Sequence, residues 1–136
     1  MEVKLTGKCL CGAVAFAVTG KVSELYKCHC SLCRKYTGTS NSAVIATAKR
    51  NFTWLKGADK VTRYQSPTGF YGVFCSTCGS PLPKPRWDKI YLVPVGTLDD
   101  APVFSKMVHL HTLSKAAWDE INDDHPQFEQ DLPPDR

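Results

Sequence analysis

Residues 7–13 read GKCLCGA, two cysteines one residue apart with a glycine directly after them. A similar arrangement returns at residues 73–80, VFCSTCGS, where the glycine is Gly79. A glycine in this position lets the backbone turn tightly just after the sulfurs. Each stretch is typical of one half of a ribbon-type zinc site, and four thiolates close a structural zinc tetrahedron. The four ligands expected for this site are Cys9, Cys11, Cys75 and Cys78.

A third group of cysteines lies between these two, in residues 26–38, YKCHCSLCRKYTG. Cys28, Cys30 and Cys33 can all reach one ion from a single turn of the chain. Because the other four cysteines are already assigned, no cysteine remains to complete a tetrahedron here. Three thiolates leave one coordination position for water or substrate, as catalytic zinc sites do. We therefore expect the functional chemistry at Cys28, Cys30 and Cys33.

The number and spacing of the seven cysteines favour metal binding over disulfides. An odd number cannot be paired completely within one chain, and closely spaced cysteines are poorly placed to bridge each other. Tetrahedral sulfur sites suit zinc or iron–sulfur clusters, and these spacings match none of the usual iron–sulfur patterns. The sequence therefore predicts two zinc ions per chain.

Histidines are the alternative ligands for the open position. His29 lies between two expected ligands, so we expect its side chain to point away from the ion. His109, His111 and His125 stay open as alternatives, because the sequence does not say where they lie. If one of them closed the shell, the second site would be structural as well.

The length and charge of the chain fit a single domain, 1–136, with a frayed acidic tail over about 129–136. The formal net charge is +4, but Lys and Arg are scattered rather than clustered, so we expect no nucleic-acid partner. Residues 9–18, CLCGAVAFAV, loosely resemble a signal-peptide core, yet they contain two cysteines and a glycine and are too short to span a bilayer. We expect a cytoplasmic protein with no membrane association.

The hydrophobic pattern is mostly β, with short alternating stretches separated by turn residues. One short helical turn is expected in 30–38. Residues 80–88, SPLPKPRWD, hold too many prolines for a central strand. Strands are expected within 2–10, 13–20, 23–31, 40–48, 51–57, 61–66, 69–75, 89–100 and 102–112.

Several conspicuous side chains have ordinary structural explanations. We expect Trp54, Trp87 and Trp118 in the core or as docking residues rather than as binding platforms. The pair Asp99–Asp100 is expected in a solvated loop, and Asp123–Asp124 in a tail where they add solubility.

The C-terminal region changes character after the last expected strand. One interpretation is that this region opens with a helical turn capped at Ser114. The interpretation that we favour is a segment that docks onto the domain through Trp118, Ile121 and Phe128.

Five stretches of the chain, taken together, resemble the CENP-V/GFA domain family, named in part for glutathione-dependent formaldehyde-activating enzymes. They recur in order over residues 7 to 128: GKCLCGAVAF, CHCSLCRKYTG, FCSTCGSPL, VGTLDD and SKAAWDEINDD…PQFE. The resemblance implies an Mss4-like (β-tent) fold, a mainly β architecture of short antiparallel strands around a structural zinc. It matches Cys9, Cys11, Cys75 and Cys78 to that zinc, and Cys28, Cys30 and Cys33 to a second zinc taken as catalytic and associated with glutathione.

The function implied by this resemblance is that of a carbon–sulfur lyase similar to S-(hydroxymethyl)glutathione synthase, which joins a thiol to formaldehyde or another small aldehyde. Tyr36, Gly38 and Thr39 lie shortly after the third cysteine and are candidate glutathione contacts, and Arg34 or Lys35 could meet a carboxylate of the thiol. One position departs from the family, which often has a basic residue where this chain has Gly72. This departure puts the preference for glutathione in question.

Two other functions remain as alternatives. The chain could be a non-catalytic, zinc-stabilised binding module, because a fold does not determine a function. The Cys28 cluster could also be a redox or metal sensor, because accessible thiolates oxidise readily.

Overall fold

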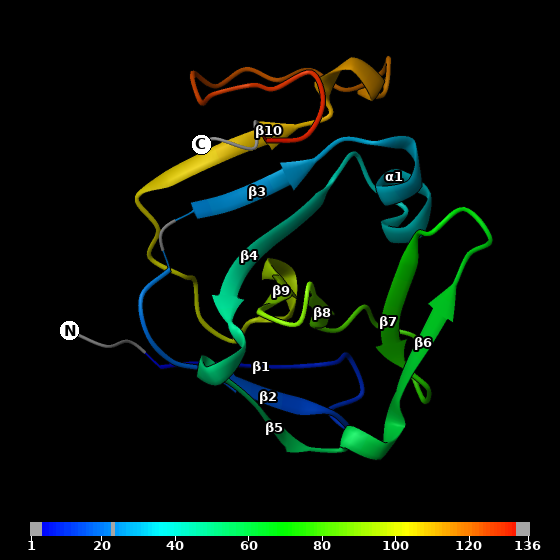
Figure 1. The fold of residues 1–136 in the computed structure, drawn as a ribbon, viewed down its shortest axis with the longest axis vertical. Coiled ribbons are helices and arrows are strands. Elements are labelled where there is room, and N and C mark those ends of the chain that lie inside the picture. The colour runs from blue at the N-terminus through cyan, green and yellow to red at the C-terminus, as the bar shows by residue number, and fades with distance from the viewer. Residues whose placement is uncertain (1–3, 23, 133–136) are drawn as a thin grey trace.

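The computed structural model describes residues 4–22 and 24–132 and is built mainly from short strands (Figure 1). Each of the nine ranges expected to hold a strand contains one, and the helical turn expected in 30–38 is α1. The elements are β1 Leu5–Lys8, β2 Ala15–Val18, β3 Glu24–Cys28, α1 Ser31–Thr37, β4 Ser42–Ala48, β5 Phe52–Lys56, β6 Val61–Gln65, β7 Tyr71–Cys75, β8 Lys84–Arg86, β9 Ile90–Pro94 and β10 Lys106–Leu110, with short 3₁₀ turns that include Val95–Thr97 and Thr112–Ser114.

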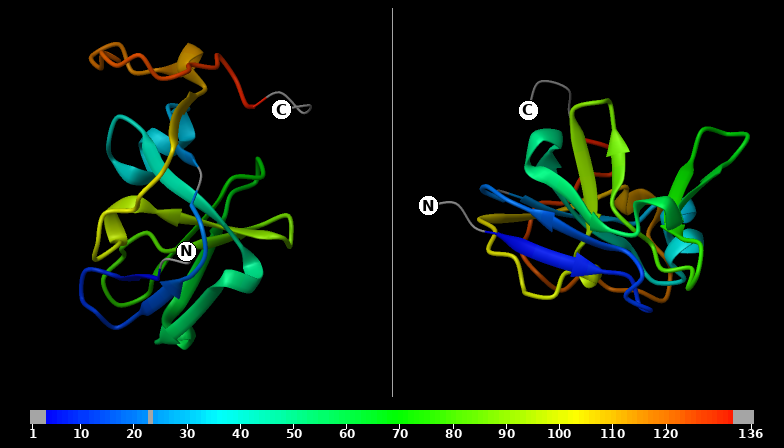
Figure 2. Two further views of the ribbon diagram at one scale, coloured as in Figure 1. Left: turned by 90° about the vertical axis from the view of Figure 1, so that its left-hand side faces the viewer. Right: turned by 90° about the horizontal axis from the view of Figure 1, so that it is seen from below.

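The strands form three sheets that surround a common interior (Figure 2). One sheet has the order β1-β2-β5, the largest has the order β10-β3-β4-β9-β8, and β6 pairs with β7 as a hairpin. The proline-containing strand β8 lies at an edge, where a missing N–H costs no ladder hydrogen bond. One expectation is wrong: β10 runs parallel to β3, from Lys106 opposite Glu24 to Leu110 opposite Cys28, so the strands are not all antiparallel.

Two hydrophobic clusters fill the interior. The first joins β2, β4 and β9 through the fully buried Phe16, Ile45 and Val93. The second surrounds the first cysteine group and contains Val14, Val73 and Leu82 with Cys9 and Cys75. Each large apolar side chain buried in this way stabilises the fold by about 1.5–3 kcal/mol. Cys9 and Cys75 therefore lie inside a packed core, whereas Cys78 is partly buried and Cys11 is exposed.

The three tryptophans do not share one role. Trp54 packs against both clusters, which confirms its expected core position. Trp87 and Trp118 are each 72% exposed, so the expectation that they are core or docking residues is wrong.

The C-terminal segment folds back along β10 instead of ending after it (Figure 1). The backbone of His109 bonds to Pro126 and Phe128, so residues 126–128 follow the outer edge of the largest sheet. The alternative of a helical turn capped at Ser114 is wrong, because Ser114 ends a 3₁₀ turn rather than beginning a helix. Ala116 is the buried residue that anchors this segment in place of Trp118.

The acidic pairs have more specific roles than solvation. Asp99 is exposed, and its carboxylate accepts hydrogen bonds from the Thr6 hydroxyl at 3.0 Å and the Lys8 ammonium at 2.8 Å. Asp123 accepts a hydrogen bond from the buried ring of His109, so the expectation that it only adds solubility is wrong. The carbonyls of residues 129 and 130 also accept backbone hydrogen bonds, while 133–136 lie outside the described residues.

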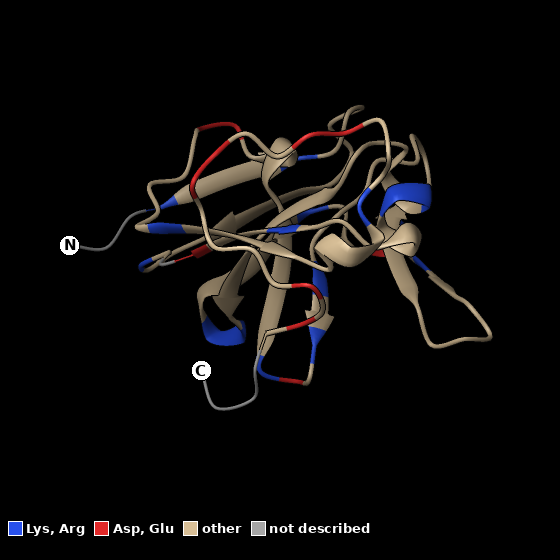
Figure 3. Cartoon of the chain, turned by 90° about the horizontal axis from the view of Figure 1, so that it is seen from above, with Lys and Arg blue, Asp and Glu red and all other residues tan. Residues whose placement is uncertain are grey.

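The Lys and Arg residues are spread over several strands and loops (Figure 3). None of the helices in the described ranges is both long and apolar enough to cross a membrane.

Candidate metal centres

The structure brings Cys9, Cys11, Cys75 and Cys78 together, with all four sulfurs within 4.8 Å of one another. The first two follow β1, Cys75 ends β7, and Cys78 lies in the turn after it. Gly12 and Gly79 both have φ of +79°, so each pair of sulfurs is followed by a left-handed turn that favours glycine. The group thus connects the three-stranded sheet to the β6–β7 hairpin, as expected for a structural site.

The distances between these sulfurs fit a tetrahedral zinc ion. Four Zn–S bonds of about 2.3 Å place the sulfurs about 3.8 Å apart. The Cys9 and Cys11 sulfurs are 3.6 Å apart, and those of Cys11 and Cys75 are 4.0 Å apart. All seven cysteines of the chain are free, so none is held in a disulfide. Backbone N–H groups of Val14 and Thr77 donate hydrogen bonds to the sulfurs of Cys9 and Cys75, which holds both sulfurs in position.

The second group, Cys28, Cys30 and Cys33, forms where β3 passes into α1. Cys28 ends the strand, and Cys30 is the N-cap of the helix. The Cys30 sulfur accepts a hydrogen bond from the backbone N–H of Cys33 at 3.3 Å, so capping the helix and positioning the thiol are one interaction. The three sulfurs lie within 4.8 Å of one another, and all three residues are partly accessible.

These three thiols are too close to ionise together on their own. Hydrogen bonds from Cys28 and Cys33 lower the pKa of Cys30 to about 2. The hydrogen bond with Cys30 raises the pKa of Cys28 to about 11. Hydrogen bonds with Cys28 and Cys30 raise the pKa of Cys33 as well. A divalent cation among the sulfurs would remove this conflict, because a coordinating thiol is deprotonated outright. The donor set therefore fits a thiophilic metal such as zinc.

No fourth metal ligand joins this group among the residues that the structure describes. His29 is buried, and its Nε2 lies 2.9 Å from Nδ1 of His109. The other ring nitrogen of His109, Nε2, lies 3.0 Å from a carboxylate oxygen of Asp123. Both histidines are therefore used in a buried chain of hydrogen bonds. His111 lies in a left-handed turn and His125 beside Asp123, and neither belongs to the cysteine group.

The His29–His109–Asp123 chain fastens the C-terminal segment to the strand that carries Cys28. His109 stands on β10, which pairs with β3, and Asp123 comes from the segment that folds back along β10. Within the described part of the chain, Nδ1 of His29 has no hydrogen-bond partner, and a carboxylate oxygen of Asp119 lies 3.9 Å from it. Sequence reasoning missed this chain because its members lie far apart in the sequence.

A small, mainly apolar pocket of about 100 Å³ lies beside Cys33. Its walls include Tyr36, Phe70, Leu82 and Lys84. Of the three candidate glutathione contacts, Tyr36 lines this pocket, whereas Gly38 and Thr39 lie at the C-terminal end of α1 and are not among its lining residues. Lys84 carries no signal in the sequence that would have linked it to the cysteines.

Arg34, a candidate for contact with a carboxylate of the thiol, has a partner within the chain. Its guanidinium Nη2 donates to the carbonyl oxygen of Ser114 at 3.2 Å, which joins α1 to the turn after β10.

Tyr36 explains why position 72 is a glycine. A Cβ atom added at Gly72 would lie 2.2 Å from Cε1 of Tyr36, whose ring covers the backbone there. The Tyr36 hydroxyl donates to the carbonyl oxygen of Val73 at 3.0 Å, which holds the ring in place. A basic side chain at position 72 is therefore incompatible with this position of Tyr36.

Comparisons with known proteins identify the family of this chain. The family model for the glutathione-dependent formaldehyde-activating enzyme (GFA) matches residues 4–114. A Halomonas elongata protein named "Putative glutathione-dependent formaldehyde-activating enzyme" is 33% identical over 128 residues, which cover 86% of this chain and 80% of that protein. The crystal structure of a Rhodobacter sphaeroides protein is similar with a TM-score of 0.57 and 25% identity, over 73% of this chain and 98% of the other. The chain therefore belongs to the glutathione-dependent formaldehyde-activating enzyme family.

Proposed function

We propose that this protein is a zinc-dependent carbon–sulfur lyase similar to S-(hydroxymethyl)glutathione synthase, which joins glutathione to formaldehyde or a similar small aldehyde. Membership of the GFA family supports the reaction and both substrates. The finer assignments belong to the same proposal: an Mss4-like fold, a structural zinc at Cys9, Cys11, Cys75 and Cys78, and a second, catalytic zinc at Cys28, Cys30 and Cys33.

One observation carries the proposal: three sulfurs converge without a fourth protein ligand in the described ranges, and one of them lines a pocket. A closed four-sulfur site would have no position for a substrate. Cys33 belongs to both the sulfur group and the pocket wall, so a ligand in the pocket would contact one of the three sulfurs that would hold the zinc.

The reaction requires a deprotonated thiol next to an aldehyde carbon. The thiol sulfur forms a bond to the carbonyl carbon, the π pair moves to the carbonyl oxygen, and this oxygen takes the proton that the thiol released. Zinc bound by Cys28, Cys30 and Cys33 would supply the positive charge that favours the thiolate form of the substrate.

The residues of this chain position the reactants. Tyr36, Phe70 and Leu82 give the pocket apolar walls that exclude water from the aldehyde, and the small volume limits the aldehyde to a small one. Holding both reactants in one pocket makes the addition effectively unimolecular, which is the main requirement of a reaction with so little bond rearrangement.

The test compares wild type with Cys30→Ser. Exchange spectroscopy with ¹³C-formaldehyde and glutathione measures adduct formation against the spontaneous rate, and elemental analysis counts zinc per chain. Serine is a good N-cap, so the variant should keep α1. We expect two zinc ions and accelerated exchange in wild type, and one zinc ion and only the spontaneous rate in Cys30→Ser.

The alternatives predict different results. A binding module would hold one zinc ion and leave the exchange rate at its spontaneous value in both proteins. A redox sensor would lose its second zinc reversibly under mild peroxide without ever accelerating exchange. Either result would overturn the proposal.

A further inference from the structure

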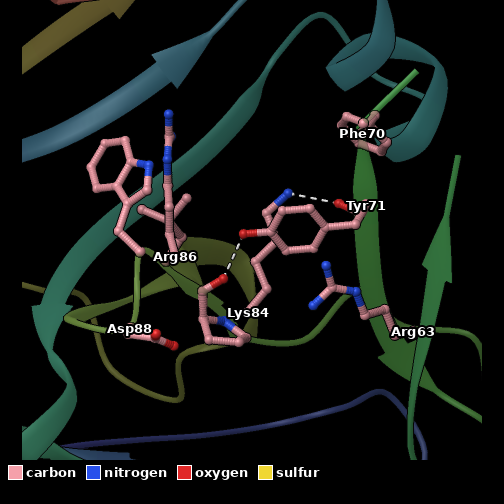
Figure 4. A pocket seen from close by; sticks show the side chains of 10 residues that line it. Arg63, Phe70, Tyr71, Lys84, Arg86 and Asp88 are labelled. Atoms are coloured by element: carbon pink, nitrogen blue, oxygen red, sulfur yellow. Dashed lines mark hydrogen bonds between the residues drawn. The ribbon is translucent and has the colours of Figure 1, made fainter. Parts of the chain in front are cut away.

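A second, larger cavity of about 500 Å³ opens between β7 and the β8–β9 hairpin (Figure 4). Its position is distinct from the cysteine pocket, but the two share Phe70, Lys84 and Leu92 as walls. The two cavities are therefore neighbours that adjoin at these three side chains. The side chains that give the cavity its chemical character are Arg63, Tyr71, Lys84, Arg86 and Trp87.

The cavity is positively charged. Arg63, Lys84 and Arg86 line it, against the single carboxylate of Asp88. Among the described residues no carboxylate lies within ion-pair distance of Arg63 or Lys84, and Arg86 has only a 3.7 Å contact with the exposed Asp131. These cations have donors to spare: the Lys84 ammonium can donate three hydrogen bonds and makes one, at 2.9 Å, to the carbonyl oxygen of Tyr71.

Aromatic rings hold these cations in place. The Lys84 ammonium lies 4.6 Å from the centre of the Tyr71 ring and 4.9 Å from that of Phe70. The Arg63 guanidinium covers the Tyr71 ring at 4.1 Å (Figure 4). Tyr71 is itself fixed, because its hydroxyl donates to the carbonyl oxygen of Pro85. Charges that are already oriented lose less entropy when an anion binds, which favours recognition.

The rim of the cavity is strained in a way that exposes a tryptophan. Trp87 and Asp88 join β8 to β9 with φ of +56° and +58°, values that bulky residues rarely adopt. Trp87 is 72% exposed, and the Arg86 guanidinium stacks on its ring at 4.1 Å. Strain of this kind is concentrated at ligand sites. An aromatic–cation pair at the mouth of a cationic cavity can cover a bound ligand.

We propose that this cavity is the recognition subsite for the carboxylate-bearing end of the thiol substrate, with Lys84 and Arg63 as the side chains that bind the anion. This inference rests on the proposed function, because it assumes that the thiol sulfur lies at the Cys28 cluster. The substrate class is then a thiol with a carboxylate several bonds from its sulfur, in preference to small neutral thiols. Lys84 on β8 and Arg63 on β6 would supply the positive charge that the family often places at the position of Gly72.

The test measures binding without chemistry. S-methylglutathione, which cannot react, and its diethyl ester, which lacks both carboxylate charges, are titrated calorimetrically into zinc-loaded wild type, Lys84→Met and Arg63→Met. Methionine keeps an unbranched apolar stem and removes the positive charge of each side chain. Lys56→Met, on the exposed face of β5 in a different sheet, is the matched control.

We expect wild type to bind the acid more tightly than the ester, and each cavity variant to weaken binding of the acid about tenfold, because hydrogen bonds to charged groups are the strong ones. Affinity for the ester should change little, and Lys56→Met should bind both ligands as wild type does. Because Arg63 is exposed on β6, its variant keeps the test valid even if Lys84→Met does not fold.

Other outcomes separate this inference from the proposed function. Equal affinity for acid and ester in wild type, or equal loss of both in the variants, would overturn the subsite even if the exchange reaction is accelerated. A selective loss of acid binding with no accelerated exchange would support the anion subsite and reject the reaction.

Discussion

Replacing Gly72 by alanine should destabilise the protein by about 1–3 kcal/mol, although alanine in a strand is normally favoured over glycine by roughly 0.5–1 kcal/mol. The new methyl group would lie 2.2 Å from Cε1 and 2.8 Å from the hydroxyl of Tyr36. Overpacking of this kind typically costs about 1–3 kcal/mol. A displaced Tyr36 would also lose its hydrogen bond to Val73, worth about 0.5–1.5 kcal/mol.

A double-mutant cycle assigns this cost to the ring. Urea unfolding of the zinc-loaded protein, followed by circular dichroism, gives the free energy of unfolding for Gly72→Ala with and without Tyr36→Ala. Without the ring, Gly72→Ala should be neutral or slightly stabilising, so the two changes should couple strongly. Gly96→Ala is the control, because a methyl group there has no atom within 4 Å. An equal cost of Gly72→Ala in both backgrounds would refute the assignment.

Three further predictions concern stability. Cys75→Ser removes one sulfur of the first site. Because structural zinc supplies about 10–16 kcal/mol of apparent binding energy in zinc-finger peptides, circular dichroism of this variant should show no cooperative unfolding. An unfolding transition like that of wild type would contradict the structural zinc site. His109→Leu leaves Nε2 of buried His29 unpaired, so urea titration should show a loss of about 1–3 kcal/mol with unchanged zinc content; an unchanged midpoint would argue against the buried chain. Lys8 holds the pKa of Asp99 below its usual value through a hydrogen bond. The stability that the Lys8–Asp99 pair contributes is therefore complete above about pH 4, and it is lost as the pH falls through the lowered pKa of Asp99 in the folded state. Lys8→Met should therefore reduce the fall in stability below pH 4 at low salt, whereas an unaltered acid limb would mean that the pair contributes nothing.

Much of the fold follows from local sequence patterns. Alternating stretches such as 13–20 and 40–48 predict β2 and β4 because the side-chain period of a strand is two. The prolines around residue 85 correctly exclude a central strand, because the ring removes a donor. The parallel pairing of β10 with β3 could not be predicted in this way, because strand direction depends on a connection that runs through most of the chain.

The grouping of the cysteines could be predicted for the same local reason: closely spaced thiols followed by glycine can converge on one point. The surroundings could not. Lys84 reaches the cysteine pocket from a proline-rich edge strand, and Tyr36 reaches Gly72 from a helix in another part of the sequence. The exposure of Trp87 and Trp118 could not be predicted either. A tryptophan in a turn can point toward the core or toward solvent, and the sequence does not say which.

The two sulfur groups differ in how much of the chain must fold before their sulfurs come together. Cys28, Cys30 and Cys33 lie within six consecutive residues, so even a nascent or unfolded chain can present all three to a metal ion. Cys9 and Cys75 meet only after the intervening chain has closed a long loop, which is costly in entropy before contacts reward it. A metal that also binds the unfolded chain stabilises the native state less. The distant pair should therefore make the larger contribution to native stability, while the local trio can acquire its metal first.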